Sequence, residues 1–337
     1  MTPRERVLTA LRHEQPDYSP YCLPIDPEPL ERLDRHYGGT EWRSAVVDHL
    51  VALGLDSGHE ELGDGRWRDK FGVVWAQAND FHVVEIPLRE PTLEGFQPPD
   101  LFGPEDLARV QQWCVQPSDL FRGFSIGFSF FERAWSLRGM DNLLMDMVEH
   151  PRFVHELMDL LLDLWLPVVD AVGRIEGLDY IQFGDDYGMQ RGVIMGTPYW
   201  REYLRPRLRA AYARAHSHGK YVAIHSCGDN SPILEDLIEI GVDLFNPFQP
   251  EAQDIYEMKR RFGHRIAFWG GIGTQQLLPR GTPEQIRREV RRVKQEIGRD
   301  GGLVLSPTKP ILPDVPTENA VACVEAMLEG TDSPLGG

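Results

Sequence analysis

The chain has 337 residues and a formal net charge of −17, with 42% hydrophobic residues. This hydrophobic content supports a sizeable core, and the length fits either two ordinary domains or one large α/β barrel. The acidic charge, without a basic stripe, argues against a nucleic-acid partner, and no apolar run approaches the length of a membrane span.

The amino-terminal residues and the cysteines indicate the cellular compartment that we expect for this chain. The amino-terminal residues carry both charge signs and no apolar core, so we expect no export signal. Four cysteines are scattered without a framework spacing, which is typical of free thiols in a reducing cytoplasm. They are Cys22, Cys114, Cys227 and Cys323.

The amino-terminal third predicts an irregular set of elements. We expect a short helix over residues 2–13, a first strand at 21–25 and a helix over 40–53. Apolar residues alternate with polar ones between residues 66 and 88, which predicts a β-hairpin that leaves the main fold or crosses its mouth. Residues 87–104 are rich in proline and polar side chains and indicate a linker.

From about residue 124 strands and helices alternate regularly. The expected strands are 124–128, 180–184, 221–225, 243–246, 265–269 and 303–305. The expected helices are about 131–148, 151–175, 198–218, 231–240, 252–262, 283–298 and 316–329. Strands that alternate with long helices indicate βαβ units and a parallel sheet.

Two weaker amino-terminal strands bring the strand count to about eight. This number favours a closed (β/α)8 TIM barrel over an open doubly wound sheet. The open sheet is also disfavoured because no dinucleotide fingerprint follows the first strand. We therefore expect one domain over residues 1–337, with the hairpin inserted at about 66–88.

His225 and Cys227 are the sharpest candidates for chemistry. They end the strand 221–225, and side chains two residues apart on a strand point the same way. Imidazole and thiolate, with a carboxylate from a neighbouring strand, are a ligand set for a catalytic zinc with one open position. The alternatives are a buried cysteine with a histidine bonded to the backbone, or a nucleophilic cysteine, for which no orienting acid is evident.

Asp185 and Asp186 follow the strand 180–184 directly. Two adjacent carboxylates at such a place can hold a metal, act as acid or base, or bind a cationic group. The simpler interpretation is that one of them caps a turn.

Further candidates come from the other strand ends and from the loops that we expect to line the pocket. Gln249 offers an amide, and Lys309 follows the last strand. Gly270 and Gly271 either let the backbone approach a ligand closely or form a plain tight turn. The remaining candidate substrate contacts are Asp26, His59, Phe128 and Tyr187.

Three segments resemble the uroporphyrinogen decarboxylase superfamily. They are Arg4-Glu-Arg-Val through Asp17, His225-Ser-Cys-Gly, and Trp269-Gly-Gly-Ile-Gly-Thr-Gln through Asn319. The resemblance covers nearly the whole chain, is weakest from about 22 to 120, and implies a (β/α)8 barrel. The superfamily includes decarboxylases that need no cofactor and zinc-dependent methyltransferases that move methyl groups to or from a corrinoid protein or coenzyme M.

The chain departs from the decarboxylases near its first strand. Their amino-terminal segment carries arginines that grip the carboxylates of the substrate, whereas this chain has Leu23-Pro-Ile-Asp26 and no arginine. Asp26 and Glu28 would repel an octa-acid. The resemblance to the decarboxylases therefore lacks its main binding groups.

The chain matches the methyltransferases at two of three metal positions. His225 and Cys227 correspond to their first two zinc ligands, but the third-ligand position falls on Lys309, and an ammonium group is a poor zinc ligand. Either Asp186 or Asp185 then supplies the third ligand, or the metal is absent and Lys309 binds an anion or acts as acid or base.

The resemblance thus implies a corrinoid-linked methyltransferase that demethylates a small methylated or methoxylated compound. The zinc would be held by His225, Cys227 and Asp186, with Lys309 and Gln249 orienting the substrate. The candidate catalytic residues are Asp186, His225 and Lys309.

Two other functions remain open. One is a cofactor-independent decarboxylase of a small acid, in which Lys309 holds a carboxylate and Asp186 stabilises a protonated intermediate. The other is a non-catalytic protein that binds a corrinoid or another small ligand. The surface helices also permit a homodimer.

Overall fold

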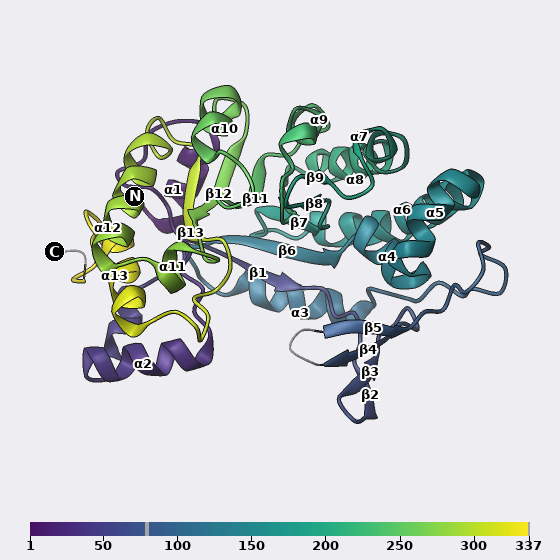
Figure 1. Ribbon diagram of the computed structural model, residues 1–337, viewed down its shortest axis with the longest axis horizontal. Helices are drawn as coiled ribbons and strands as arrows, with labels where there is room; N and C mark the ends of the chain where they lie inside the picture. Colours follow the sequence, from purple (N-terminus) through teal and green to yellow (C-terminus); the bar gives the residue numbers. More distant parts are fainter. Residues whose placement is uncertain (78–80, 336–337) are drawn as a thin grey trace.

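Seven parallel strands form the centre of the molecule, and the computed structural model describes residues 1–77 and 81–335. In spatial order they are β1 (Leu50–Gly54), β6 (Phe121–Phe128), β7 (Tyr180–Gly184), β10 (Tyr221–His225), β11 (Leu244–Phe248), β12 (Ala267–Ile272) and β13 (Leu303–Pro307). All neighbours pair in parallel, so every carboxyl end lies at the same edge. The sheet is curled into a TIM-like half-barrel (Figure 1), which confirms the predicted α/β class.

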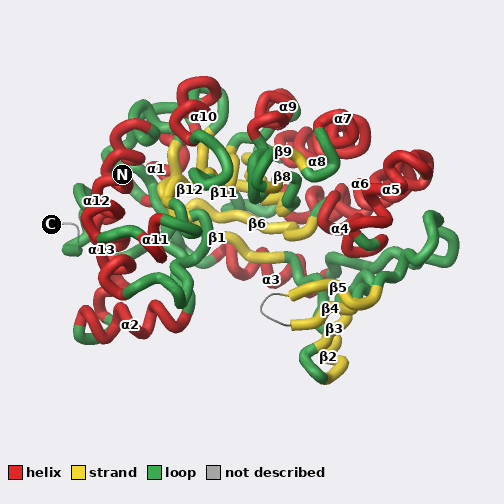
Figure 2. Tube along the Cα trace, viewed as in Figure 1, coloured by secondary structure: helices red, strands yellow, loops and turns green. Residues whose placement is uncertain are grey.

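The helices lie around the outside of this sheet (Figure 2). They are α1 (Pro3–Leu11), α2 (Pro27–Tyr37), α3 (Pro104–Val115), α4 (Phe131–Arg138), α5 (Met140–Glu149), α6 (Pro151–Gly173), α7 (Thr197–Tyr199), α8 (Arg205–Ser217), α9 (Leu234–Glu239), α10 (Ile255–Phe262), α11 (Leu277–Arg280), α12 (Pro283–Glu296) and α13 (Thr317–Leu328). Short 3-10 turns cover Glu41–Ala45 and Ser231–Ile233, and a π turn covers Trp200–Leu204. Among the described residues no helix combines the length and the apolar character that a membrane span requires.

The helix α12 shows how local sequence and packing agree in this shell. Its N-cap is Thr282, whose side chain accepts a hydrogen bond from a backbone N–H three residues on, and a proline occupies the first turn. Ile286, Val290 and Val293 recur at helical spacing and are fully buried. The helix therefore turns one apolar stripe inward, where it contacts β12.

The strands β7 and β13 are buried along their whole length. A parallel strand is covered by helices on one face and by the barrel interior on the other, so it is apolar on both. This burial explains why the sequence predicts these strands from continuous apolar runs.

The segment predicted as the first strand is a pair of isolated bridges. Tyr21 pairs in parallel with Leu305 of β13, and Ile25 pairs with Ile311 beyond it. On the other side the backbone N–H of His49, just before β1, donates to the Tyr21 carbonyl at 2.9 Å. This segment therefore contacts both edge strands without being a strand itself, so the described sheet has seven strands and not the eight that the sequence predicts.

The predicted helix over residues 40–53 is wrong. Its first part is only the 3-10 turn, and its second part is the strand β1. The apolar run Leu50 to Leu53 is compatible with either a helix or a strand. The parallel ladder to β6, in which Leu50 pairs with Phe121, decides for the strand.

The predicted hairpin is part of a larger antiparallel sheet beside the carboxyl end of β6 (Figure 1). Its strands, in order, are β2 (Glu60–Gly63), β3 (Arg66–Arg68), β4 (Val74–Gln77) and β5 (Phe81–Glu85). Residues 78–80 of the predicted range lie outside the described residues. Between β3 and β4 the buried Asp69 accepts hydrogen bonds from the backbone N–H groups of Phe71 and Val73, each at 3.0 Å.

His49 lies at the connection between Tyr21 and β1. It is 2% exposed, and its Nδ1 accepts a hydrogen bond from the Tyr21 backbone N–H at 3.3 Å. Burial, together with the charge of the nearby Arg6, lowers the pKa of His49 to about 4, and Asp17 opposes this shift. The neutral imidazole is therefore the form that the fold stabilises.

We expect the free energy of unfolding to fall as the pH decreases from about 6.5 to about 4. In this window the unfolded chain takes up a proton on residue 49 that the folded chain does not bind. The contribution of this residue is about 3 kcal/mol. Urea unfolding of wild type and His49→Asn across this pH range measures the effect. The variant keeps an acceptor near Tyr21 and should lose this part of the pH dependence, whereas His36→Asn, on the exposed side of α2, should keep it.

Candidate functional site

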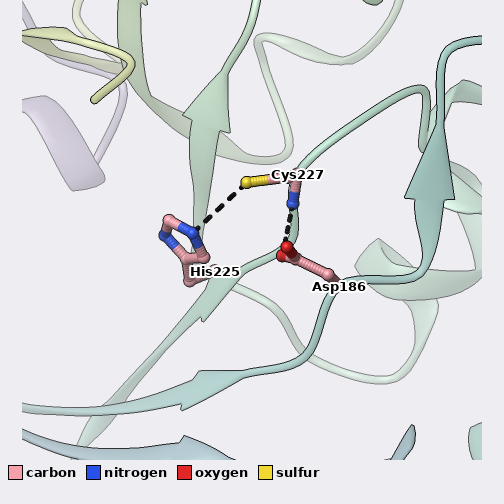
Figure 3. A group of neighbouring side chains, drawn as sticks. All are labelled: Asp186, His225 and Cys227. Carbon is pink, nitrogen blue, oxygen red and sulfur yellow. Dashed lines mark hydrogen bonds between the residues drawn. The ribbon is translucent and has the colours of Figure 1, made fainter. Parts of the chain in front are cut away.

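Three adjacent strands place the predicted chemistry at one edge of the sheet. In the ladder, His225 at the end of β10 pairs with Gly184 at the end of β7 and with Asn246 of β11. The loops that follow β7 and β10 then carry Asp186 and Cys227 toward each other (Figure 3). The register of parallel strands is therefore what brings these residues together.

Asp186, His225 and Cys227 form a compact cluster, and each is partly buried. One ligand atom from each residue lies within 4.8 Å of the others. The Cys227 sulfur is 3.5 Å from His225 Nε2, and the Cys227 backbone N–H donates to Asp186 Oδ1 at 2.7 Å (Figure 3). Nitrogen, sulfur and oxygen donors converge here, as the sequence predicts.

Asn246 sets the tautomer of His225. Its Nδ2 donates to the Trp269 carbonyl at 3.1 Å, so its Oδ1 faces His225 Nδ1 at 2.6 Å. An amide oxygen accepts only, so Nδ1 carries the proton and the Nε2 lone pair faces Cys227. Histidine ligands of metals are commonly oriented by such a bond from their second nitrogen.

The turn after Cys227 is held rigidly by neighbouring groups. Gly228 has φ +82°, and a Cβ at this position would lie 2.4 Å from the backbone of Gly188, so only glycine fits. Its N–H donates to Gln249 Oε1 at 3.1 Å. Asn230 Nδ2 donates to the carbonyls of Cys227 and Gly228. The side chain of Gln249, a predicted substrate contact, is thus engaged in fixing the cysteine loop.

The electrostatics of the cluster favour a cation. Burial, together with the charge of Asp186, raises the pKa of Cys227 to about 12, and Lys309 opposes this shift. Burial, together with the carboxyls of Asp186 and Asp185, raises the pKa of Glu132 to about 9. Three carboxyls and a thiol therefore share one poorly solvated region, where a bound cation would lower these pKa values.

Asp185 has a structural position. It is 1% exposed, and its carboxylate accepts hydrogen bonds from the backbone N–H groups of Phe130, Phe131 and Glu132, at 3.1, 2.9 and 2.6 Å. These are the orphan donors at the start of α4. Burial raises the pKa of Asp185 to about 6, against these hydrogen bonds, which lower it. Of the two adjacent carboxylates, Asp185 caps a helix and Asp186 joins the cluster.

Three further predicted contacts pack within the protein. Tyr187 is fully buried, and its ring lies 5.8 Å from that of Trp200. A Cβ on Gly270 would lie 2.6 Å from the backbone N of Phe248, and one on Gly271 would lie 3.0 Å from Val293. Close packing against β11 and α12 therefore accounts for both glycines.

The remaining predicted contacts lie around the mouth. Lys309 is exposed, and Asp26 occupies the N-cap position of α2, where its backbone N–H donates to the Ile311 carbonyl at 3.1 Å. His59 is exposed, and its ring stacks on that of Trp67 with the ring centroids 5.2 Å apart. Phe128, at the end of β6, lines a pocket of about 250 Å³ beside the antiparallel sheet.

Sequence reasoning missed Glu132, Arg133 and the role of Asn246. Glu132 and Arg133 lie in the first turn of α4, just after the carboxyl end of β6. Their position after a barrel strand was the available signal. Arg133 lines the same pocket as Phe128.

The comparisons with known proteins agree on one family. The uroporphyrinogen decarboxylase (URO-D) family matches residues 128–329. The uroporphyrinogen decarboxylase of Methylococcus capsulatus is 28% identical over 186 residues, 54% of this chain and 50% of that protein. The methylated-thiol–coenzyme M methyltransferase of Methanosarcina mazei is 24% identical over 163 residues, 48% of this chain and 41% of that protein.

A solved structure extends the likeness to the whole fold. A methyltransferase from Methanosarcina mazei superposes with a TM-score of 0.70 at 21% identity, over 97% of this chain and 98% of that one. The chain spans about half the length of the curated relatives it matches.

Substitutions of the two adjacent carboxylates should differ in their effect on stability. We expect Asp185→Ala to lower the free energy of unfolding by about 1–3 kcal/mol, because three buried N–H groups lose their acceptor. Asp186→Ala removes one acceptor at a partly buried position, so its effect should stay below about 1 kcal/mol. Urea unfolding of the two variants measures the difference, and an equal or reversed ranking would contradict the assignment of Asp185 as a cap.

Proposed function

The chain belongs to the uroporphyrinogen decarboxylase (URO-D) family, and we propose that it is a methyltransferase of that family. In this proposal it demethylates a small methylated or methoxylated compound and passes the methyl group to a corrinoid protein or a thiol. The observation that carries it is the convergence of Asp186, His225 and Cys227 at the carboxyl ends of β7 and β10. The whole-chain superposition on a methyltransferase supports it at the level of the fold.

The donor set fits a zinc ion. One nitrogen, one sulfur and one carboxylate oxygen are common zinc ligands, and three protein ligands leave a position open for substrate. His225 presents Nε2 because Asn246 holds Nδ1. Zinc bound by these residues would supply Lewis-acid chemistry, activating a thiol acceptor or polarising the heteroatom that carries the methyl group.

The chain's own residues hold this arrangement in place. Gln249 fixes the loop after Cys227, and the Cys227 backbone N–H fixes one oxygen of Asp186. Lys309 is exposed at the mouth, and its charge lowers the pKa of Cys227. In the proposal it orients the substrate and is no metal ligand.

The metal is tested by elemental analysis of the purified protein. We expect about one equivalent of zinc in the wild type, and a loss of at least tenfold in affinity for Cys227→Ala and Asp186→Ala, since each removes a ligand. Cys114→Ala is the matched control, because Cys114 is a buried cysteine elsewhere in the fold. Less than about a tenth of an equivalent in the wild type, unchanged by Cys227→Ala, would sink the zinc part of the proposal.

The reaction is tested with cob(I)alamin as methyl acceptor. Zinc-loaded wild type should form methylcobalamin from a methylated thiol or a methoxylated donor, followed by its absorbance. Cys227→Ala should reduce the rate at least about a hundredfold, because a missing metal ligand removes the Lewis acid, and Cys114→Ala should retain it. A rate that is equal in wild type and Cys227→Ala would contradict a role for the cluster.

A decarboxylase is the second candidate, favoured by the curated decarboxylases among the relatives and by the exposed Lys309. In it, Lys309 would hold the carboxylate of a small acid and Asp186 would stabilise a protonated intermediate. Lys309→Met should then abolish substrate binding, and a chelator should leave turnover unchanged. Under the methyltransferase proposal the chelator abolishes turnover, so this single treatment separates the two candidates.

A further inference from the structure

A pocket of about 250 Å³ lies between the antiparallel sheet and the end of β6. Aromatic rings dominate its lining: Trp67, Trp75, Phe81 and Phe128, with Asp69 and Arg133 as the charged members. This volume is below the range of drug-sized ligand pockets, so it suits a ligand with one ring.

The aromatic rings of the pocket form a continuous wall. Trp67 and Trp75 stack at 6.5 Å with 14° between their planes. The ring of Trp75 lies 5.7 Å from Phe128 and 5.8 Å from Phe81. Flat rings at these separations favour a planar aromatic guest, which can stack on one ring and meet the edge of another.

Arg133 is the unusual member of this lining. It is 4% exposed, and its Nη1 donates to Asp69 Oδ2 at 2.7 Å. Its Nε is buried without a hydrogen-bond partner among the described residues. Nη2 also has no hydrogen-bond partner among the residues that the structure describes. Nε and Nη2 form one edge of the guanidinium, the geometry that binds a carboxylate through two parallel hydrogen bonds.

Asp69 does not occupy that edge. Its carboxylate is shared among the N–H groups of Phe71 and Val73, the indole N–H of Trp75 and Arg133. Its negative charge is therefore already matched by four donors. Burial lowers the pKa of Arg133 in spite of Asp69, so an additional anion would stabilise the charged guanidinium.

The first turn of α4 supports both the pocket and the cluster of Asp186, His225 and Cys227. Arg133 and Glu132 are neighbours in the first turn of α4, which Asp185 holds against the end of β7. The carboxyl of Glu132 interacts electrostatically with both Asp186 and Cys227. A ligand in the pocket would thus lie next to the cluster, across the first turn of this helix.

We propose that this pocket binds the methyl donor as an aromatic carboxylate, with the ring against Trp67, Trp75 and Phe128 and the carboxylate on the free edge of Arg133. The inference names the substrate class of the same site, and it rests on the proposed function for the methyl-donor role of the ring. Binding of the acid itself depends only on the pocket.

Benzoate is the probe, titrated into chelator-treated protein and followed by tryptophan fluorescence and calorimetry. We expect saturable binding, weakened at least about tenfold for benzyl alcohol, which lacks the charge, and for cyclohexanecarboxylate, which lacks the aromatic ring. Absence of saturation up to about 10 mM benzoate, or equal affinity for the three probes, would overturn the inference.

Arg133→Lys should weaken benzoate binding at least about tenfold, because an ammonium group cannot make the paired hydrogen bonds. Arg138→Lys is the matched control: Arg138 is also buried in α4 and paired with an aspartate, Asp146 at 2.7 Å, but it does not line the pocket. Equal loss in both variants would show a general effect on α4 and would overturn the role of Arg133.

A second variant pair covers the case in which Arg133→Lys does not fold. Trp67→Leu should weaken benzoate binding several-fold, and Trp113→Leu, a half-buried tryptophan outside the pocket, should leave it unchanged. Unchanged benzoate affinity in Trp67→Leu would contradict the assigned wall. Since these titrations contain no zinc and no corrinoid, they can succeed where the methyl-transfer assay fails, and the two hypotheses are tested separately.

Discussion

Asp185 connects the end of β7 to the start of α4, and the whole mouth of the sheet is arranged around this contact. Its carboxylate accepts the first three N–H groups of the helix region, at 2.6 to 3.1 Å. The helix start is thereby fixed against the strand, with Glu132 and Arg133 on its first turn. The next residue, Asp186, continues toward Cys227. One buried acid thus positions the third member of the cluster and the arginine of the pocket.

The cluster itself depends on a chain of hydrogen bonds that begins outside it. The Trp269 carbonyl orients the Asn246 amide, and the amide orients His225. The imidazole then presents a lone pair to Cys227, whose thiol has its pKa raised to about 12 by burial. This thiol lies beside the carboxyl of Asp186 in a poorly solvated place, where a bound cation would lower the pKa of the thiol.

The two regions at the mouth differ in character, and under the two proposals they would bind the two ends of one substrate. One region has soft and hard donors for a metal, whereas the other has aromatic walls and a buried arginine. The segment from Leu23 to Asp26 carries no arginine, and Asp26 is the N-cap of α2. Under the proposal, an anionic ligand of this chain would be bound by Arg133 on α4, within an apolar wall suited to one ring.

The sequence by itself determined the βαβ rhythm and the cluster residues His225 and Cys227. Periodic apolar runs are local signals, and these strands are buried along most of their length, so their positions could be read directly. The tertiary structure alone decided three other points. Residues 50–54 became a strand because β6 offers a ladder to an apolar run of ambiguous period. Asp185 and Asp186, identical side chains in adjacent positions, took opposite roles because only one faces the orphan N–H groups of α4. Arg133 came to line the pocket because packing brought α4 into contact with the antiparallel sheet at Asp69, which lies some sixty residues earlier in the chain. Such long-range contacts leave no periodic trace in the sequence, and for that reason the strand-end cluster was predictable and the pocket beside it was not.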